Sequence, residues 1–258
     1  MTPAGAWTKA LAAMLAAAIV LPVLAVAPLA FSDQSFLVLP PRNWSLRWWG
    51  VFFADASWLR ALLTSLEVAA LSCMLSVAAG TAAALGLQEL GPRMRAIASG
   101  LLLGPMIAPV IVLAVGLYAL ARSFGLVGST LGLVLAHTML ALPYVVLNVG
   151  VAVAALDPRL ALAASGLGAG PWRAFRTVIL PSILPGIVGG GVFAFVTSFD
   201  EVVLAVFLAG PSVKTLPVRI WEEVRVEYTP VVAVAATLMI VLALAGSAAA
   251  RLATRSAT

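Results

Sequence analysis

A polar interlude between two long apolar runs reads DPRLALAASGLGAGPWRAFRTVILP, residues 157–181. Its first two residues, Asp157 and Pro158, are typical of a helix start. The Asp side chain can accept hydrogen bonds from free backbone N–H groups, and Pro suits the first helical position, where no N–H bond is lost. We therefore predict a short helix that runs to about Ser165.

The glycines that follow predict a turn. Gly166, Gly168 and Gly170 can each adopt positive φ at little steric cost, and Pro171 can open a second helix. That second helix would carry two arginines toward the Leu180–Pro181 pair. The stretch 157–181 thus predicts a helix, a glycine turn and a helix outside the membrane.

The composition around this loop indicates a membrane protein. The chain is 63% hydrophobic and 10% charged, with a mean hydropathy of +1.11. Six charge-free runs each reach the roughly 20 residues that a helix needs to cross the hydrocarbon core. The fold class expected is an all-α polytopic membrane protein with six transmembrane helices in a single domain over residues 1–258. The spans are expected at about 10–31, 59–87, 97–120, 131–155, 183–208 and 230–250.

The first apolar run could also be interpreted as a signal peptide, because Ala25-Val26-Ala27 resembles a cleavage site. Its length and its two prolines, Pro22 and Pro28, favour a kinked transmembrane helix. The net charge of +5 does not indicate nucleic-acid binding, because the basic residues are scattered at helix ends. With a single cysteine, Cys73, no internal disulfide is expected.

Three acidic residues fall inside the predicted spans. Asp200 and Glu201 lie seventeen and eighteen residues after Ile183, so Asp200 is about 25 Å along the fifth span. Glu67 lies about 12 Å into the second span from the opposite end. Ionisable groups are costly in a bilayer and point to a pathway, a pairing or a water-filled cavity. A layer of carboxylates near the outer face would attract a cation.

The roles of the individual acids are open at this level. Neighbouring residues on a helix point about 100° apart, so we favour Asp200 on the pathway and Glu201 toward a neighbouring helix. Alternatively, the acids are neutralised by His137, Arg60 or a partner subunit. His137, the only histidine, has no ligand cluster around it and is expected to pack or to bond to backbone, with a gate as the other possibility.

Small residues recur at four-residue spacing in the spans. The pairs are Gly100 with Gly104, Gly128 with Gly132, and Gly186 with Gly190. Such pairs permit close approach of two helices. In a chain with 21 glycines they support bundle packing without identifying which helices meet.

The loop 157–181 resembles the cytoplasmic "EAA" loop of the inner-membrane permeases of ABC importers. The family pattern is Glu-Ala-Ala, three residues, Gly, nine residues, then Ile-x-Leu-Pro. The residues at those spacings here are Leu162, Ala163, Ala164, Gly168, Val178, Leu180 and Pro181. The resemblance implies that this EAA-type coupling loop, with Arg173, docks on a separate ATPase. Leu162 replaces the family's Glu, so one contact to the ATPase is expected to differ.

The stretch SFDEVVLAVFLAGP, residues 198–211, is similar to the fifth helix of the second permease of polyamine (spermidine/putrescine) importers. A Leu-Pro element and a last span follow, and the similarity covers about residues 58–250. The resemblance implies a permease that imports polyamine-like organic cations. Relatives with the acidic pair are also linked to opine-like, amino-acid-derived and aminophosphonate cargo, which stays an alternative.

The same resemblance implies the setting of the protein. The partners expected are a second homologous permease subunit, two ATPase subunits that carry ATP and Mg, a periplasmic or extracellular solute-binding protein, and the lipid bilayer; no nucleic acid is expected. The location is the bacterial inner membrane with both termini cytoplasmic. The charge count agrees only narrowly, with eight basic residues inside against seven outside.

Enzymatic chemistry is not expected on this chain. The sequence contains no GxxxxGK[ST] phosphate loop, no GxSxG serine and no HExxH pair, so no catalytic, cofactor-binding or metal-binding residues are assigned. Two further hypotheses stay open. One is a secondary transporter that uses Asp200 and Glu67, although no inverted repeat is visible. The other is a membrane-embedded scaffold or enzyme subunit. The mixed-charge loop 210–229 could meet a binding protein or form a salt-bridged helix.

Overall fold

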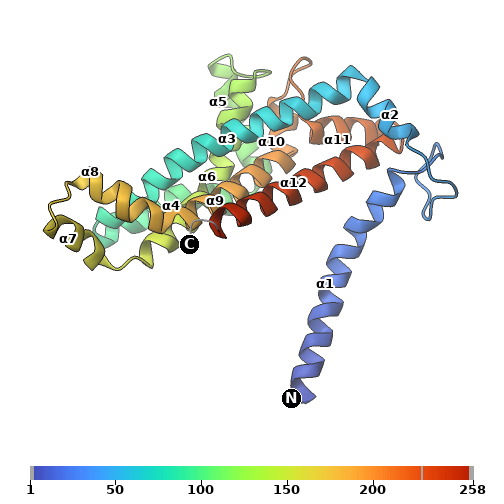
Figure 1. Ribbon diagram of the computed structural model, residues 1–258. Coiled ribbons are helices and arrows are strands. Elements are labelled where there is room, and N and C mark those ends of the chain that lie inside the picture. Colours follow the sequence, from blue (N-terminus) through green and yellow to red (C-terminus); the bar gives the residue numbers. More distant parts are fainter. Residues whose placement is uncertain (1–2, 228, 256–258) are drawn as a thin grey trace. The chain divides into compact units, whose positions relative to one another are not determined.

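The computed structural model describes residues 3–227 and 229–255, with side chains described except at 3–6, 158, 161–162 and 251–255. Within these residues the regular structure is helical, apart from one isolated bridge between Ser32 and Trp44 (Figure 1). This confirms the all-α prediction. The helices are α1 Pro3–Leu29, α2 Arg47–Ala54, α3 Ala56–Glu89, α4 Pro92–Ile107, α5 Val110–Ser123, α6 Thr130–Ala154, α7 Pro158–Gly166, α8 Pro171–Ala174, the π-helical turn η1 Phe175–Ile179, α9 Leu180–Asp200, α10 Val203–Leu208, α11 Leu216–Val226 and α12 Val231–Arg255.

Five helices in the described part of the chain are long and apolar enough to cross a membrane. They are α1, α3, α6, the continuous helix Pro171–Asp200 formed by α8, η1 and α9, and α12. A sixth span results if α4 and α5 are counted together, although their axes are bent by 103° at a short break. The six expected spans therefore each have a counterpart among these elements.

The prediction of one uninterrupted helix over 97–120 is wrong. The structure breaks it at Ala108 and Pro109, between α4 and α5. Pro109 cannot donate a backbone hydrogen bond, and its ring disfavours helical geometry at the preceding residue. Ala108 accordingly has extended backbone angles, φ −68° and ψ 142°.

The predicted boundaries of the fifth span, 183–208, are also wrong at both ends. The helix begins at Pro171 and ends at Asp200, and α10 is a separate helix. Pro181 does not end this helix. The preceding turn η1 has hydrogen bonds that span five residues instead of four, such as the bond from the Leu180 N–H to the Phe175 carbonyl. A π turn changes which carbonyl each N–H must reach, so a proline beside it costs less than in a regular α-helix.

The chain forms two compact units, Met1–Arg60 with Arg219–Leu242, and Ala61–Val218 with Ala243–Thr258. In the first unit the Arg219 guanidinium lies 4.7 Å from the ring centre of Trp58 and 2.9 Å from the Glu223 carboxylate. Part of the mixed-charge loop is therefore a salt-bridged helix, α11. The expectation of a single domain over 1–258 stays a prediction.

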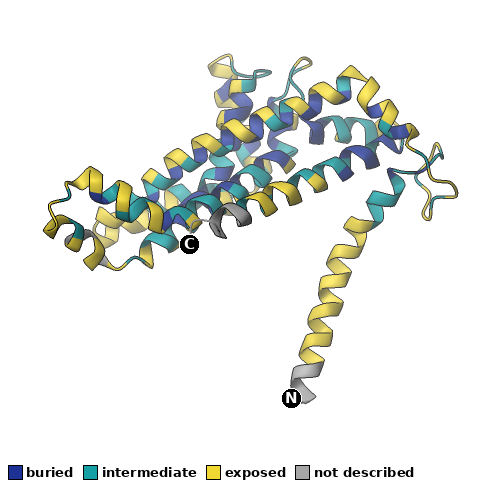
Figure 2. Ribbon diagram, viewed as in Figure 1, coloured by how far each residue is buried: buried dark blue, intermediate teal, exposed yellow. Residues whose placement is uncertain are grey.

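The second unit is built on the contact between α6 and α9, which both have many buried residues. Figure 2 shows buried residues in dark blue. Its helices meet where glycines remove side-chain bulk. A Cβ built on Gly190 would lie 2.9 Å from the Val145 Cα, and one on Gly186 would lie 2.8 Å from the Asn148 carbonyl oxygen. One apolar cluster lies at this contact, and its fully buried members are Ala141, Val145, Val149, Ile183 and Ala194. A second cluster joins α6 to α5 and α10, and its fully buried members are Leu133, Ala114, Leu204 and Ala205.

The pair on α4 behaves differently. Apart from their own helix, no described atom lies within 4 Å of a Cβ built on Gly100 or Gly104. Of the predicted close approaches, the pair on α9 is thus confirmed, and the pair on α4 faces open space. The two pairs supply a matched comparison.

Gly190→Ala should lower the melting temperature of the purified chain in detergent by several degrees, because overpacking a tight interior contact costs about 1–3 kcal/mol. Gly100→Ala is the control and should leave the melting temperature unchanged or slightly raised, since alanine favours helix over glycine by about 0.5–1 kcal/mol. Equal melting temperatures for the two variants would contradict the α6–α9 contact described here.

Candidate functional site

The predicted acidic pair lies where the helix breaks between α9 and α10, rather than inside a continuous helix. Asp200 is the last residue of α9, and its side chain is exposed. Glu201 follows with extended backbone angles, φ −72° and ψ 117°, and α10 begins two residues later. The Oε1 atom of Glu201 accepts a hydrogen bond of 2.8 Å from the backbone N–H of Leu204. Glu201 therefore caps the first turn of α10.

The two carboxylates differ in their contacts. Glu201 is half-buried and bound to backbone, whereas Asp200 has no ion-pair partner among the described residues of its unit. Glu67, on α3, is also exposed and has no such partner in the same set of residues. The carboxylates of Asp200 and Glu67 are therefore accessible, whereas the Glu201 carboxylate is already bound to the Leu204 backbone.

His137 lies next to this break. It is 1% exposed, and its Nδ1 atom lies 3.1 Å from the Ser198 carbonyl oxygen and 2.9 Å from the Ser198 hydroxyl oxygen. The expectation that His137 packs and bonds to backbone is confirmed. The contact joins α6 to the last turn of α9 two residues before Asp200.

The loop 157–181 has the helix, turn and helix that its sequence predicts. Asp157 caps α7, accepting a hydrogen bond of 2.9 Å from the Arg159 N–H. At the other end, Gly168 N–H bonds to the Ser165 carbonyl and Ala169 N–H bonds to the Ala164 carbonyl. These two bonds define a Schellman motif, which requires a left-handed residue just past the helix.

Gly168 is that left-handed residue, with φ +81°. The prediction that all three glycines turn with positive φ is wrong for the other two. Gly166 is the last residue of α7, and Gly170 is the cap of α8 with φ −67°. One left-handed residue suffices, because the Schellman hydrogen bonds reverse the chain at a single position.

The other residues predicted for coupling are distributed over the loop and the start of α9. Ala163 and Arg173 are exposed, Ala164 is half-buried, Leu180 is half-buried and Pro181 is exposed. Leu162 lies in the α7 backbone, but its side chain is outside the described residues. The side chains of Ala163 and Arg173 are therefore accessible to a partner.

Two large apolar side chains were not predicted as site residues. Leu167, at the end of α7, is 90% exposed, and Trp172, in α8, is 72% exposed and stacks on Phe175 at 5.6 Å between ring centres. The loop thus exposes two large apolar side chains. Their signal in the sequence is the presence of Leu and Trp beside turn glycines.

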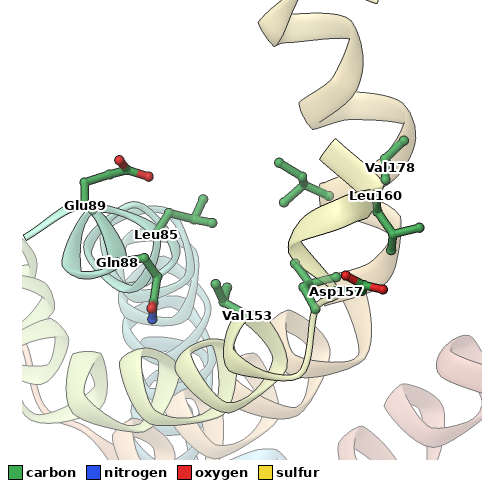
Figure 3. Close-up of a pocket in the computed structure, with 10 residues that line it drawn as sticks. Leu85, Gln88, Glu89, Val153, Asp157, Leu160 and Val178 are labelled. Carbon is green, nitrogen blue, oxygen red and sulfur yellow. The ribbon is translucent and has the colours of Figure 1, made fainter. Parts of the chain in front are cut away.

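A groove of about 490 Å³ lies beside this loop (Figure 3). Figure 3 shows Leu85 and Gln88 of α3 on one side, and Leu160 and Val178 on the other. Asp157 and Glu89 add two carboxylates to an otherwise largely apolar lining. The groove lies between the end of α3 and α7, and α7 contacts α8 and η1.

That helix joins the two parts of the site. It runs without interruption from Pro171, at the loop, to Asp200, at the acidic break. Its 30 residues correspond to about 45 Å at about 1.5 Å per residue. The loop and Asp200 thus lie at opposite ends of one helix.

Comparison with known proteins places this arrangement in a family. Residues 76–257 match the family described as "Binding-protein-dependent transport system inner membrane component". The chain is 36% identical over 207 residues to the spermidine/putrescine transport system permease protein PotC of Haemophilus influenzae, covering 79% of each chain. It is 32% identical over 217 residues to the putrescine transport system permease protein PotI of Escherichia coli, covering 81% of this chain and 76% of that one.

Relatives named for the transport of other cargo also match. The molybdenum transport system permease protein ModB of Mycobacterium bovis is 32% identical over 237 residues, covering 85% of this chain and 89% of that one. Among solved structures, a bacterial alginate ABC transporter in complex with its alginate-bound periplasmic protein aligns with a TM-score of 0.72 and 15% identity, covering 96% of this chain and 94% of that one. This structural likeness supports the fold.

The helical architecture, the match over residues 76–257 and the identity to two polyamine permeases agree with one another. We conclude that this chain belongs to the family of inner membrane components of binding-protein-dependent transport systems.

Proposed function

We propose that this chain is the permease subunit of an ATP-driven importer of polyamine-like organic cations. In this proposal the loop 157–181 receives the movement of a separate ATPase, and the acidic break lies on the path of the cargo. The observation that carries it is the continuous helix Pro171–Asp200, which has the loop at one end and Asp200 at the other. The PotC and PotI relatives support the choice of cargo.

Charge is the physical reason for preferring a cationic cargo. Asp200 and Glu67 are exposed carboxylates without an ion-pair partner among the described residues of their unit. A carboxylate a few ångströms from an ammonium group gains several kcal/mol in a partly desolvated site, and an anion would be repelled by a similar amount. The carboxylates thus disfavour anionic cargo on this path. Opine-like, amino-acid-derived and aminophosphonate cargo, which can carry amino groups, stays the alternative.

The loop supports a motor on another polypeptide. Leu167 and Trp172 present apolar surface, and Ala163 and Arg173 are accessible beside them. Burying such side chains against a partner would remove apolar area from water and hold the loop to it. We place Leu162, Ala164, Gly168, Leu180 and Pro181 in the same coupling element. A second homologous permease, two ATPase subunits with ATP and Mg, and a solute-binding protein complete the proposed assembly.

The proposed orientation has both termini and the loop 157–181 in the cytoplasm of a bacterium, with the acidic break toward the outer side of the inner membrane. The ATP chemistry belongs to the partner, so the chain itself is proposed to be non-catalytic. A secondary transporter that uses Asp200 and Glu67 would move cargo without the ATPase. A scaffold or enzyme subunit would have no ATPase partner.

Asp200→Asn should reduce spermidine uptake by the assembled transporter about tenfold, because it removes a charge from the cation path with little change in shape. Uptake of radiolabelled spermidine into proteoliposomes measures the effect. Glu227→Gln is the control, since it removes an exposed carboxylate at the end of α11 and should leave uptake unchanged. Unchanged uptake in Asp200→Asn with intact assembly would remove this acid from the mechanism.

Gly168→Ala should weaken association with the ATPase subunit several-fold, because a left-handed conformation costs an alanine about 1 kcal/mol or more. Gly166→Ala is the matched control, since Gly166 lies in α7 without positive φ and with open space around a built Cβ. The measurement is co-purification of the ATPase together with its hydrolysis rate. If the two variants retain the ATPase equally, the turn is not part of the coupling element.

A further inference from the structure

The last turn of α9 contains a backbone carbonyl group that needs a hydrogen-bond donor from outside the helix. A helix leaves the carbonyl groups of its last turn without partners from within the helix. The Ser198 carbonyl belongs to that last turn, because α9 ends at Asp200. Its regular partner would be the N–H of residue 202, which lies beyond the break. The His137 Nδ1 atom, at 3.1 Å, occupies the position of that partner.

The burial of His137 selects the tautomer. A carbonyl oxygen can only accept, so a bond to it requires the proton on Nδ1. The Nε2 atom is buried and has no hydrogen-bond partner among the described residues. With the proton on Nδ1, the unpaired atom is an acceptor. With the proton on Nε2, the Nδ1 atom could accept from the Ser198 hydroxyl at 2.9 Å, but a buried Nε2–H and the Ser198 carbonyl would both lack partners among the described residues, which costs more.

We propose that His137 is a positioning residue for the acidic pair. Its Nδ1–H bonds to the Ser198 carbonyl, ends α9 at Asp200 and lets Glu201 turn into the extended conformation that caps α10. Asp200 then stays exposed while Glu201 is engaged with Leu204. The structural part of this inference follows from the two hydrogen bonds alone. Its relevance to transport rests on the proposed function.

The contact links elements that are far apart in sequence. His137 is 61 residues before Ser198 and lies on α6, which packs along α9. The bond therefore ties the acidic break to the contact between α6 and α9. A histidine that served only to fill space would need no donor directed at the last turn of its neighbour.

The test compares two amide substitutions of His137. His137→Asn places an N–H near the Nδ1 position, and His137→Gln places one near the Nε2 position. Each is combined with Cys73→Ala and with either Asp200→Cys or Glu201→Cys, in the assembled full-length transporter. The measurement is the rate at which a cationic methanethiosulfonate reagent modifies the single cysteine at each position.

With His137 present, modification at position 200 should be about tenfold faster than at position 201, because one side chain is exposed and the other is half-buried. His137→Asn should keep this ratio. His137→Gln should reduce it about fivefold to tenfold, as expected from the loss of one buried hydrogen bond. Ser198→Ala should keep the ratio, since it preserves the carbonyl and removes only the hydroxyl.

Equal ratios in the Asn and Gln variants would overturn the proposal, and so would a loss in Ser198→Ala as large as in His137→Gln, which would make the hydroxyl the partner. The modification ratio does not depend on transport. Failure of the proposed function would instead appear as unchanged spermidine uptake in Asp200→Asn, so the two failures are distinguishable.

Discussion

The close packing of α6 against α9 is the constraint on which the rest of this structure depends. Gly186 and Gly190 allow the two backbones to approach at a distance that no larger residue permits. In a bilayer, helix association gains little from apolar burial, because lipid tails are as apolar as the side chains, so intimate packing and hydrogen bonds must supply the stability. The His137 bond to Ser198 adds such a polar link near one end of the contact.

Because α9 is held along α6, its two ends lie at two different features. The start, continuous with α8 and η1, carries the loop with the Gly168 turn, and the end carries Asp200. An open groove lies beside α7, between the loop and the end of α3. The π turn at Phe175–Ile179 is the irregular point of this helix, and π turns frequently occur at functional sites.

Much of the fold could be predicted from local sequence. Charge-free runs located the spans, and Asp157 with Pro158 located α7, because solvation in lipid and helix capping act over a few residues. Pro109 also carried a local signal for the break at Ala108, which the span prediction did not use. The end of α9 at Asp200 could not be predicted from local sequence. The Ser198 carbonyl in its last turn bonds to His137, which lies 61 residues earlier in the chain. The capping role of Glu201 followed from that break. Similarly, only the folded Schellman motif distinguishes Gly168 from Gly166 and Gly170.

The central claim is that nucleotide bound to a partner at the loop changes the surroundings of Asp200 at the far end of the helix. The most direct measurement is the modification rate of Asp200→Cys, in the Cys73→Ala background, by a cationic thiol reagent in the assembled transporter, with and without a trapped ATP state. The account predicts that trapping ATP changes this rate, because the loop and Asp200 share one helix. An identical rate in both states, in an assembled transporter that hydrolyses ATP, would contradict it.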